Sequence, residues 1–330
     1  LAVNNPAAAF LRPREAIVNL DYGEVSQNKK CVVAFADESI LTPLRYQWWE
    51  KAKGEYRAPY VFEGEKRIMI SDSISNVIKK KCENSTPSAF FGERISIRGE
   101  AIGIPMLMEP GRNIAVIGAP DGECNQAVGM MESMAISLAV QHTKGDARFL
   151  FCNFTNTKII FSKQYPHFSK LMEQCGYYLE DIPCRQFEET LRNLMEEKTE
   201  NETVYMFGIG MDKWGYEPDP YGQGTVLKEF VEKGPSEGLH FFGWWVKASS
   251  YTAQVAGFGN SDAFNTKIFL RVDERAVQSL TSPFVRWKSQ NNRGLLSDSV
   301  ELEEELVFIP YAPVTSDDVL KIKAYLYEAN

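Results

Sequence analysis

The stretch NIAVIGAPDGECNQ, from Asn113 to Gln126, sets the architecture of the chain. Its apolar run, Asn113 to Ala119, lacks polar alternation, which is typical of a strand buried on both faces. A turn follows, and a helix is predicted from about Asn125 to Gln141. Because apolar strands and helices go on alternating after this point, the sequence predicts an α/β fold with a mostly parallel sheet and helices on both faces.

After this stretch, predicted strands and helices continue to alternate. Further buried strands are predicted at Ala147–Phe154, Val204–Gly210, Gly238–Val246 and Asn265–Val272. Helices are predicted around Phe168–Cys175, Gln186–Glu197 and 224–234, with short strands near Gly294–Ser297 and Glu305–Ile309. A final amphipathic helix is predicted through Tyr325, capped by Thr315 or Ser316.

The first 92 residues have a different character and are predicted to form a small α/β connector. Apolar runs at 14–21 and 30–36 flank a turn and predict a hairpin. Thr42 and Pro43 are predicted to open a helix, a short strand is expected at 60–64, and another helix at 71–84. The segment ENSTPSAFFGE, 83–93, is predicted to be a linker. The predicted domains are therefore 1–92 and 93–330.

Composition restricts the functional classes. The 330 residues carry 36 Lys and Arg against 44 Asp and Glu, a formal charge of −8, which argues against autonomous, sequence-independent DNA binding. No run of about 18 apolar residues predicts a membrane span. The start, LAVNNPAAAFLRPRE, lacks signal-peptide features and an initiator Met, so we expect a fragment of a longer cytoplasmic protein. Six scattered cysteines and three histidines argue for reduced thiols and against a zinc site.

The turn after the first buried strand stands where a phosphate loop, G-x-x-x-x-G-K-[ST], would stand. Glu123 replaces the second Gly, Cys124 replaces the Lys that neutralises phosphate, and Asn125 replaces the hydroxyl that holds magnesium. No Lys or Arg occurs between Arg112 and Lys144. We therefore predict a vestigial phosphate loop, with no catalytic residue and no reactive thiol, formed by Gly118, Asp121, Gly122, Glu123, Cys124 and Asn125.

The third buried strand is where a magnesium-binding acid would be expected. It reads VYMFGIGMDKW, and Asp212 is its one carboxylate, with Lys213 standing where a catalytic Glu would be. Two interpretations stay open for Asp212. It is either a helix-capping or surface acid, or a displaced magnesium ligand.

In the order of its motifs, the sequence resembles the motor domain of the FtsK/SpoIIIE group of the HerA/FtsK ATPases. The resemblance rests on GRNIAVIGAPDGECNQ, ARFLFCNFTNTK, GPSEGLHFFGWWVKASS and FNTKIFLRVDERAVQSL, and covers roughly Arg94 to Pro313. It implies a RecA-like P-loop NTPase fold, and a structural role for His240. The family's Thr-Gln pair that senses the γ-phosphate corresponds here to Trp245 and Val246.

The resemblance and these departures together imply a degenerate, non-catalytic module with a scaffold, assembly or regulatory role. Its partners would be other FtsK-like modules of the same polypeptide. The parent motor would use ATP and magnesium, translocate DNA and form a ring, and a membrane-associated parent stays open. Two alternatives stay open: a module of a type VII secretion-like ATPase, or a residual ATPase whose neighbour supplies an arginine, with Arg271, Arg275 and Arg286 as candidates. No cofactor is expected in this fragment.

A guiding surface for nucleic acid is a further candidate function. The segment from Phe284 to Arg293 places Arg286, Lys288 and Arg293 around Trp287, which is a pattern of strand-tracking loops but also of a solvated turn. Trp244 and Trp245 are candidates for base stacking as well. Adjacent aromatics on a strand point to opposite faces, so we expect these two to lie in the core.

Overall fold

The chain divides into two compact units, Leu1–Tyr60 and Val61–Asn330. The computed structural model describes residues 6–20, 24–55, 65–83, 86–96, 99–121, 124–155, 158–197, 202–215, 225–256 and 263–328. The division falls after Tyr60, whereas the sequence placed a boundary at 92/93. The difference arises because the segment from 65 to 92 includes a helix and most of a strand that belong to the second unit.

The first unit contains a hairpin and a helix. Strands β1 (Glu15–Val18) and β2 (Lys29–Val32) pair antiparallel, as predicted, and short 3-10 turns lie at Pro6–Phe10 and Val25–Gln27. Helix α1 (Glu38–Ala52) begins earlier than predicted, because Asp37 caps it by accepting a hydrogen bond from the Ser39 amide at 2.9 Å. Pro43 thus lies inside the helix. None of the described residues of this unit is buried.

The second unit is built on a ten-stranded sheet with the order β4-β3-β12-β11-β10-β5-β9-β8-β6-β7. The strands from β10 to β7 run parallel, and β11, β12, β3 and β4 extend the sheet antiparallel. The strands are β3 (Ser88–Arg94), β4 (Ala101–Pro105), β5 (Ile114–Ile117), β6 (Ala147–Asn153), β7 (Leu179–Asp181), β8 (Thr203–Ile209), β9 (Leu239–Trp245), β10 (Thr266–Phe269), β11 (Gly294–Asp298) and β12 (Leu306–Pro310).

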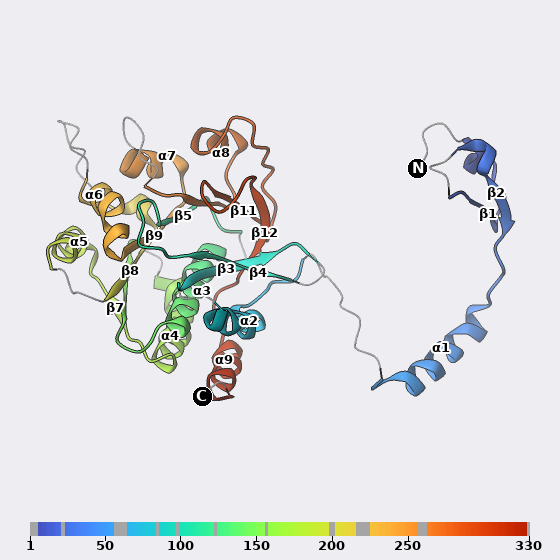
Figure 1. Ribbon diagram of the computed structural model, residues 1–330, viewed down its shortest axis with the longest axis horizontal. Helices are drawn as coiled ribbons and strands as arrows, with labels where there is room; N and C mark the ends of the chain where they lie inside the picture. The colour runs from blue at the N-terminus through green and yellow to red at the C-terminus, as the bar shows by residue number, and fades with distance from the viewer. Residues whose placement is uncertain are drawn as a thin grey trace. The chain divides into compact units, whose positions relative to one another are not determined.

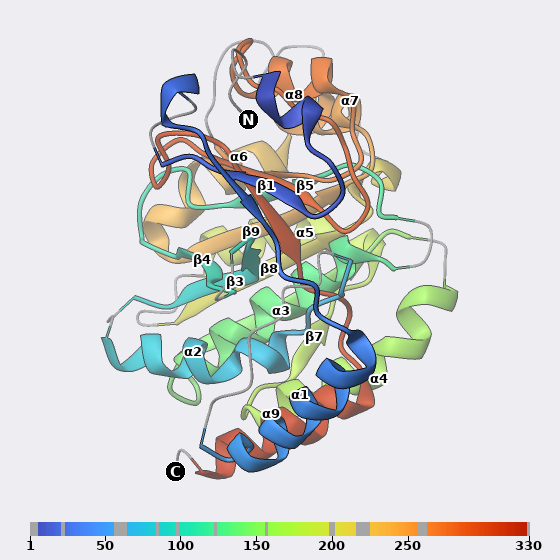
Figure 2. The ribbon, with the colours of Figure 1, turned by 90° about the vertical axis from the view of Figure 1, so that its right-hand side faces the viewer.

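Helices cover both faces of this sheet (Figures 1 and 2). On one face lie α2 (Ile70–Glu83), α3 (Gln126–Gln141), α4 (Lys158–Gln174) and α9 (Ser316–Glu328). On the other lie α5 (Phe187–Glu196), α6 (Val226–Lys233), α7 (Ala248–Tyr251) and α8 (Glu274–Leu280). Each face has its own apolar cluster, and alternate residues of β9 enter opposite clusters: Phe242 and Trp244 one, Phe241 and Trp245 the other. The predicted α/β class, mostly parallel sheet and two helical layers are confirmed.

The predicted linker at 83–93 is wrong, because most of it is strand β3. Ala89, Phe90 and Phe91 are fully buried, and the strand pairs with β12 and β4. Gly92 suggested a loop, but its small size serves close packing instead. A Cβ atom there would come within 2.4 Å of the Ile309 carbonyl oxygen.

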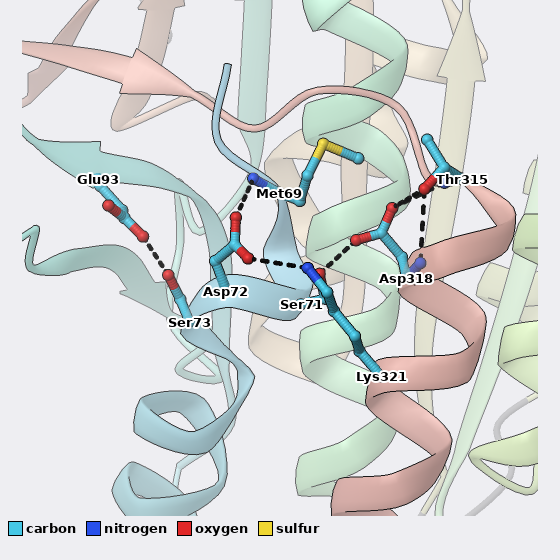
Figure 3. Close-up of polar contacts among 8 residues, drawn as sticks. All are labelled: Met69, Ser71, Asp72, Ser73, Glu93, Thr315, Asp318 and Lys321. Atoms are coloured by element: carbon cyan, nitrogen blue, oxygen red, sulfur yellow. Dashed lines mark hydrogen bonds and ion pairs between the residues drawn. The ribbon is translucent and has the colours of Figure 1, made fainter. Parts of the chain in front are cut away.

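Helices α2 and α9 are joined at their amino ends by polar contacts, drawn in Figure 3. Ser71 donates to Asp318, and the Lys321 ammonium lies 3.2 Å from the Asp72 carboxylate. The Asp318 carboxylate also accepts from the Thr315 amide at 2.8 Å, while the Thr315 hydroxyl accepts from the Asp318 amide at 3.4 Å. Thr315, one of the two predicted caps, therefore caps α9. Across the described ranges, no helix is both long and apolar enough to cross a bilayer.

Candidate functional site

The loop that follows β5 is held by the two strands that flank β5. The Gly118 amide donates to the Trp245 carbonyl at 2.8 Å, and the Trp244 indole donates to the Gly118 carbonyl at 3.1 Å. Ala119 and Arg271 exchange two backbone hydrogen bonds of 3.2 Å each. Gly118 has a φ of +120°, and a Cβ there would lie 3.1 Å from the Arg271 nitrogen. The loop therefore lies at the carboxyl edge of the parallel strands, where ligands bind in open α/β sheets.

Side chains of the protein itself bind the backbone amides at the amino end of α3. The Cys124 amide donates to Asp121 Oδ1 at 2.9 Å, and the Asn125 side chain accepts from the Val128 amide at 3.1 Å. Gln126 completes the arrangement, because its side chain donates to the Asp121 carboxylate and accepts from the Asp121 amide at 3.0 Å. A carboxylate thus stands where the unpaired amides of a helix start attract an anion. Gly122 and Glu123 lie outside the described residues.

Cys124, at the position of the phosphate-loop lysine, carries a half-buried thiol. Burial raises the pKa of this thiol to about 11; the Arg67 charge opposes the rise, and Asp121 and Glu132 add to it. The thiol is therefore protonated at neutral pH, so it supplies neither the positive charge of a lysine nor a nucleophilic thiolate. The raised pKa agrees with the prediction that Cys124 is not a reactive thiol, which stays a prediction.

Two arginines lie near this loop although the sequence between Arg112 and Lys144 contains none. Arg271 follows β10, and its backbone pairs with Ala119. Arg67 precedes α2 and acts electrostatically on Cys124. Both side chains are exposed. The sequence indicated Arg271 only as a candidate arginine finger. It did not indicate Arg67, because Arg67 lies far from Cys124 along the chain. Arg275, another finger candidate, is exposed on α8.

Asp212 links the ends of two parallel strands. It lies in a 3-10 turn, Met211–Lys213, after β8, and its two carboxylate oxygens accept from the Val246 amide at 2.5 Å and the Lys247 amide at 3.0 Å. These amides follow β9. Asp212 therefore acts as a structural acid that caps the two amides after β9. Magnesium binding by Asp212 stays a prediction. In the described part of the chain, no group of three or more His, Cys, Asp or Glu is placed to hold a metal ion.

Sequence reasoning missed a glutamine beside Asp212. The buried Gln254 side chain accepts from the Trp245 indole at 2.7 Å and donates to the Met211 carbonyl at 2.8 Å. It thereby ties the end of β9 to the turn after β8. No motif in the sequence indicates this contact, because Gln254 lies beyond the strand in an irregular π-helical turn, Thr252–Ala256.

Two buried ionisable side chains lie elsewhere in the second unit, one on α3 and one at the amino end of β9. Glu132 of α3 is 1% exposed, and its carboxyl group accepts from the Val314 amide at 2.7 Å. Burial raises its pKa to about 8. His240 is fully buried at the start of β9, with its Nδ1 atom 2.8 Å from the Arg112 carbonyl oxygen, and burial lowers its pKa to about 4. The burial of His240 and its contact with Arg112 agree with the structural role that the resemblance implies.

The candidate nucleic-acid segment lacks its aromatic platform. Trp287 is only 5% exposed, and its indole donates to the Leu270 carbonyl at 3.2 Å, so it packs in the core and is not available to stack on a base. Arg286 is exposed and pairs with Glu274 at 3.1 Å. Lys288 is exposed, and Arg293 donates to the Asn292 carbonyl at 2.7 Å. Trp244 and Trp245 also lie in the core, as expected.

The topology places β9 between β5, which leads into the loop, and β8, which leads to Asp212. The sequence predicted a phosphate-loop position after the first buried strand, and the structure places that position after β5. The second unit thus has an α/β fold, with helices on both faces of a mostly parallel sheet. The sequence matches no protein-family model and no curated protein.

Several solved structures are similar to the chain. EssC (ATPases 2 and 3) of Geobacillus thermodenitrificans is 14% identical, with a TM-score of 0.44 over 83% of this chain and 52% of that one. EccC (ATPases 2 and 3) of Thermomonospora curvata, in complex with a signal sequence peptide, is 15% identical, with a TM-score of 0.44 over 73% and 47%. The pCW3 conjugation coupling protein TcpA is 13% identical, with a TM-score of 0.47 over 74% and 72%. The chain spans about half the length of the EssC and EccC chains, and likeness at such identities concerns the fold alone.

Proposed function

We propose that the chain is a non-catalytic RecA-like module of a larger motor ATPase, with a scaffold, assembly or regulatory role. The observation that carries this proposal is the hydrogen bond from the Cys124 amide to the Asp121 carboxylate. In this position, an internal anion binds the helix end that would otherwise receive phosphate oxygens. The module then contributes binding surfaces to the motor, and other modules hydrolyse ATP.

Electrostatics supports the same conclusion. A helix start favours a nearby anion by about 0.3–1 kcal/mol at an exposed site, which is small beside the repulsion of a triphosphate by a neighbouring carboxylate. The Asp121 carboxylate is held at the loop by the Cys124 amide and by Gln126. The lysine of the motif would supply a compensating positive charge, but the uncharged Cys124 occupies its position.

A residual nucleotide-binding function is the second candidate, and one observation favours it. Arg271 is joined to the loop through Ala119, and the charge of Arg67 reaches Cys124. Arginines bind phosphate well. In this alternative, magnesium-ATP would bind after Asp121 turns away from the amide, and Arg271→Ala would abolish that binding.

Titration calorimetry with magnesium-ATP at high protein concentration separates the two candidates. For the non-catalytic module we expect no heat of binding, whereas micromolar affinity would contradict the proposal. A variant with Glu123→Gly, Cys124→Lys and Asn125→Thr, which restores the phosphate-loop motif, is the matched control. We expect this variant to bind at least tenfold more tightly than the wild type. Asp317→Asn, an exposed substitution on α9, controls for loss of negative charge elsewhere.

The parent protein that we infer is a cytoplasmic, ring-forming DNA translocase with several FtsK-like modules, and a type VII secretion-like motor is the alternative. In this proposal the chain itself makes no membrane contact, and any DNA contact uses Arg286 and Lys288. Retention on DNA that falls with added salt, and that weakens in an Arg286→Ala, Lys288→Ala variant, would support a DNA-guiding surface. Retention that is absent or insensitive to salt would favour a protein substrate.

A further inference from the structure

A cleft of about 440 Å³ opens at the carboxyl edge of the sheet, away from the loop after β5. Phe154 after β6, Trp214 after β8 and Cys184 of the 3-10 turn Cys184–Gln186 line it, together with Arg185 and Lys213. The Phe187 ring packs edge-on against Phe154 at 5.2 Å and against Trp214 at 5.4 Å. The wall of the cleft is therefore a packed aromatic layer that carries one exposed thiol, Cys184.

A second cysteine lies directly behind this thiol. Cys184 Sγ donates a hydrogen bond of 3.1 Å to the carbonyl oxygen of Asn153, the residue that follows Cys152 in β6. Cys152 is buried, and its side chain lies in the same apolar cluster as Phe154, because alternate residues of a strand point to one face. Burial raises the pKa of the Cys152 thiol, and the nearby Cys184 thiol adds to this rise. An exposed and a buried thiol thus form a pair at one edge of the cleft.

The backbone around the pair is fixed on both sides. The Ile182 amide donates to the Phe151 carbonyl at 2.7 Å, which continues the parallel pairing of β7 with β6 up to the turn that holds Cys184. On the other side, the Phe154 amide donates to the Ile209 carbonyl at 2.9 Å. These contacts hold the two cysteines in a constant relation to each other.

We propose that Cys184 is an oxidant-sensitive modification site and that Cys152 is its resolving partner. Hydrogen peroxide would oxidise the Cys184 thiol to a sulfenic acid, with release of one water molecule. The Cys152 thiol would then attack the sulfenic sulfur, the sulfur–sulfur bond would form, and a second water molecule would leave with the hydroxyl group and the Cys152 proton. Two electrons pass from the thiol pair to the peroxide, and a reducing thiol reverses the change.

Two of the three other described cysteines make useful controls. Cys31 is exposed in the first unit, and Cys175 is half-buried in the second. Burial raises the pKa of Cys175 to about 12 and raises the pKa of Cys152 as well, so the pKa does not separate these two thiols and only their positions do. If exposure alone decided oxidation, Cys31 would react like Cys184. If the Cys152–Cys184 pair decides which thiol is oxidised, Cys184 forms an intramolecular disulfide with Cys152 and Cys31 forms none.

The experiment treats the whole chain with hydrogen peroxide, blocks free thiols with iodoacetamide and identifies linked peptides by mass spectrometry. We expect one intramolecular Cys152–Cys184 bridge per chain, with reactive thiols in denaturant falling from six to four and recovering with dithiothreitol. Dimedone, which traps sulfenic acids, should label Cys184 in a Cys152→Ser variant and leave Cys184 unlabelled in the wild type.

Several results would overturn the proposal. Dimedone labelling of Cys184 in the wild type without a linked peptide would show that Cys152 does not resolve it. Oxidation of Cys31 or Cys175 in preference to Cys184 would show that the cleft confers no selectivity. Since Cys152→Ser affects a buried position, the wild-type mass spectrum decides the matter even if that variant fails to fold.

Discussion

Asp121 and Asp212 both direct their carboxylates to backbone amides of the protein itself. Asp121 binds the amide of Cys124, three residues along the chain, whereas the amides that Asp212 binds lie 34 and 35 residues further on. The sequence shows that the loop lacks a lysine, because that is a matter of residue identity. It does not show where the Asp212 carboxylate points or that Arg67 lies near Cys124, because those facts depend on long-range packing.

Glu132 gives a prediction at the level of a single residue. Its pKa is about 8 in the folded chain against 4.5 for an ordinary Glu, so from about pH 4.5 to 8 the folded state retains a proton that the unfolded state has released. The free energy of unfolding must therefore fall as the pH rises through this window. We expect Glu132→Gln, which can still accept from Val314, to raise the melting temperature at pH 8 more than at pH 5.

The control for this prediction is Glu173→Gln, which changes an exposed acid on α4. Thermal unfolding is followed at several pH values for the wild type and both variants. Parallel profiles for the wild type and Glu132→Gln would show that the Glu132 carboxyl group ionises as readily in the folded chain as in the unfolded one.

Secondary-structure elements were predictable where one local signal dominates. The parallel strands β5, β6, β8, β9 and β10 were found from continuous apolar runs, because burial on both faces leaves no polar alternation. Strand β3 was missed because Ser, Pro and Gly surround its two phenylalanines. The start of α1 was misplaced because Asp37 is an equally good cap that comes before Thr42.

The start of α3 gives a prediction for an element. Asn125 stands where a magnesium-binding hydroxyl would be, and in the structure it caps the helix through the Val128 amide. We expect Asn125→Ala to lower the free energy of unfolding in urea by about 1 kcal/mol, because a helix loses its cap. Asn125→Ser, which keeps a capping oxygen, should lose clearly less. Equal stability of all three proteins would show that the cap is not formed.

At the scale of the whole molecule, the two units differ in how much apolar surface they bury. The second unit contains two extensive apolar clusters, one on each face of its sheet. The described residues of the first unit include none that is buried, although Trp48, Trp49 and Phe35 are large and apolar. A lone two-stranded hairpin and a single helix are marginal in water, so this unit is not expected to be stable by itself.

This contrast predicts the behaviour of the separated units. A chain that begins at Val61 should unfold cooperatively, with a melting temperature close to that of the full chain. Residues 1–60 alone should show no cooperative transition by circular dichroism. A cooperative transition in the isolated first unit would contradict the prediction, as would loss of cooperative unfolding in residues 61–330.

The central claim, that Asp121 fills the place of phosphate at the amino end of α3, is tested most directly by crystallography. A crystal of the wild-type chain is soaked with magnesium and a non-hydrolysable ATP analogue, and density is sought beside Cys124. The account predicts that Asp121 keeps its hydrogen bond to the Cys124 amide and that no nucleotide density appears there. Triphosphate density against that amide, with the Asp121 side chain turned away, would contradict it.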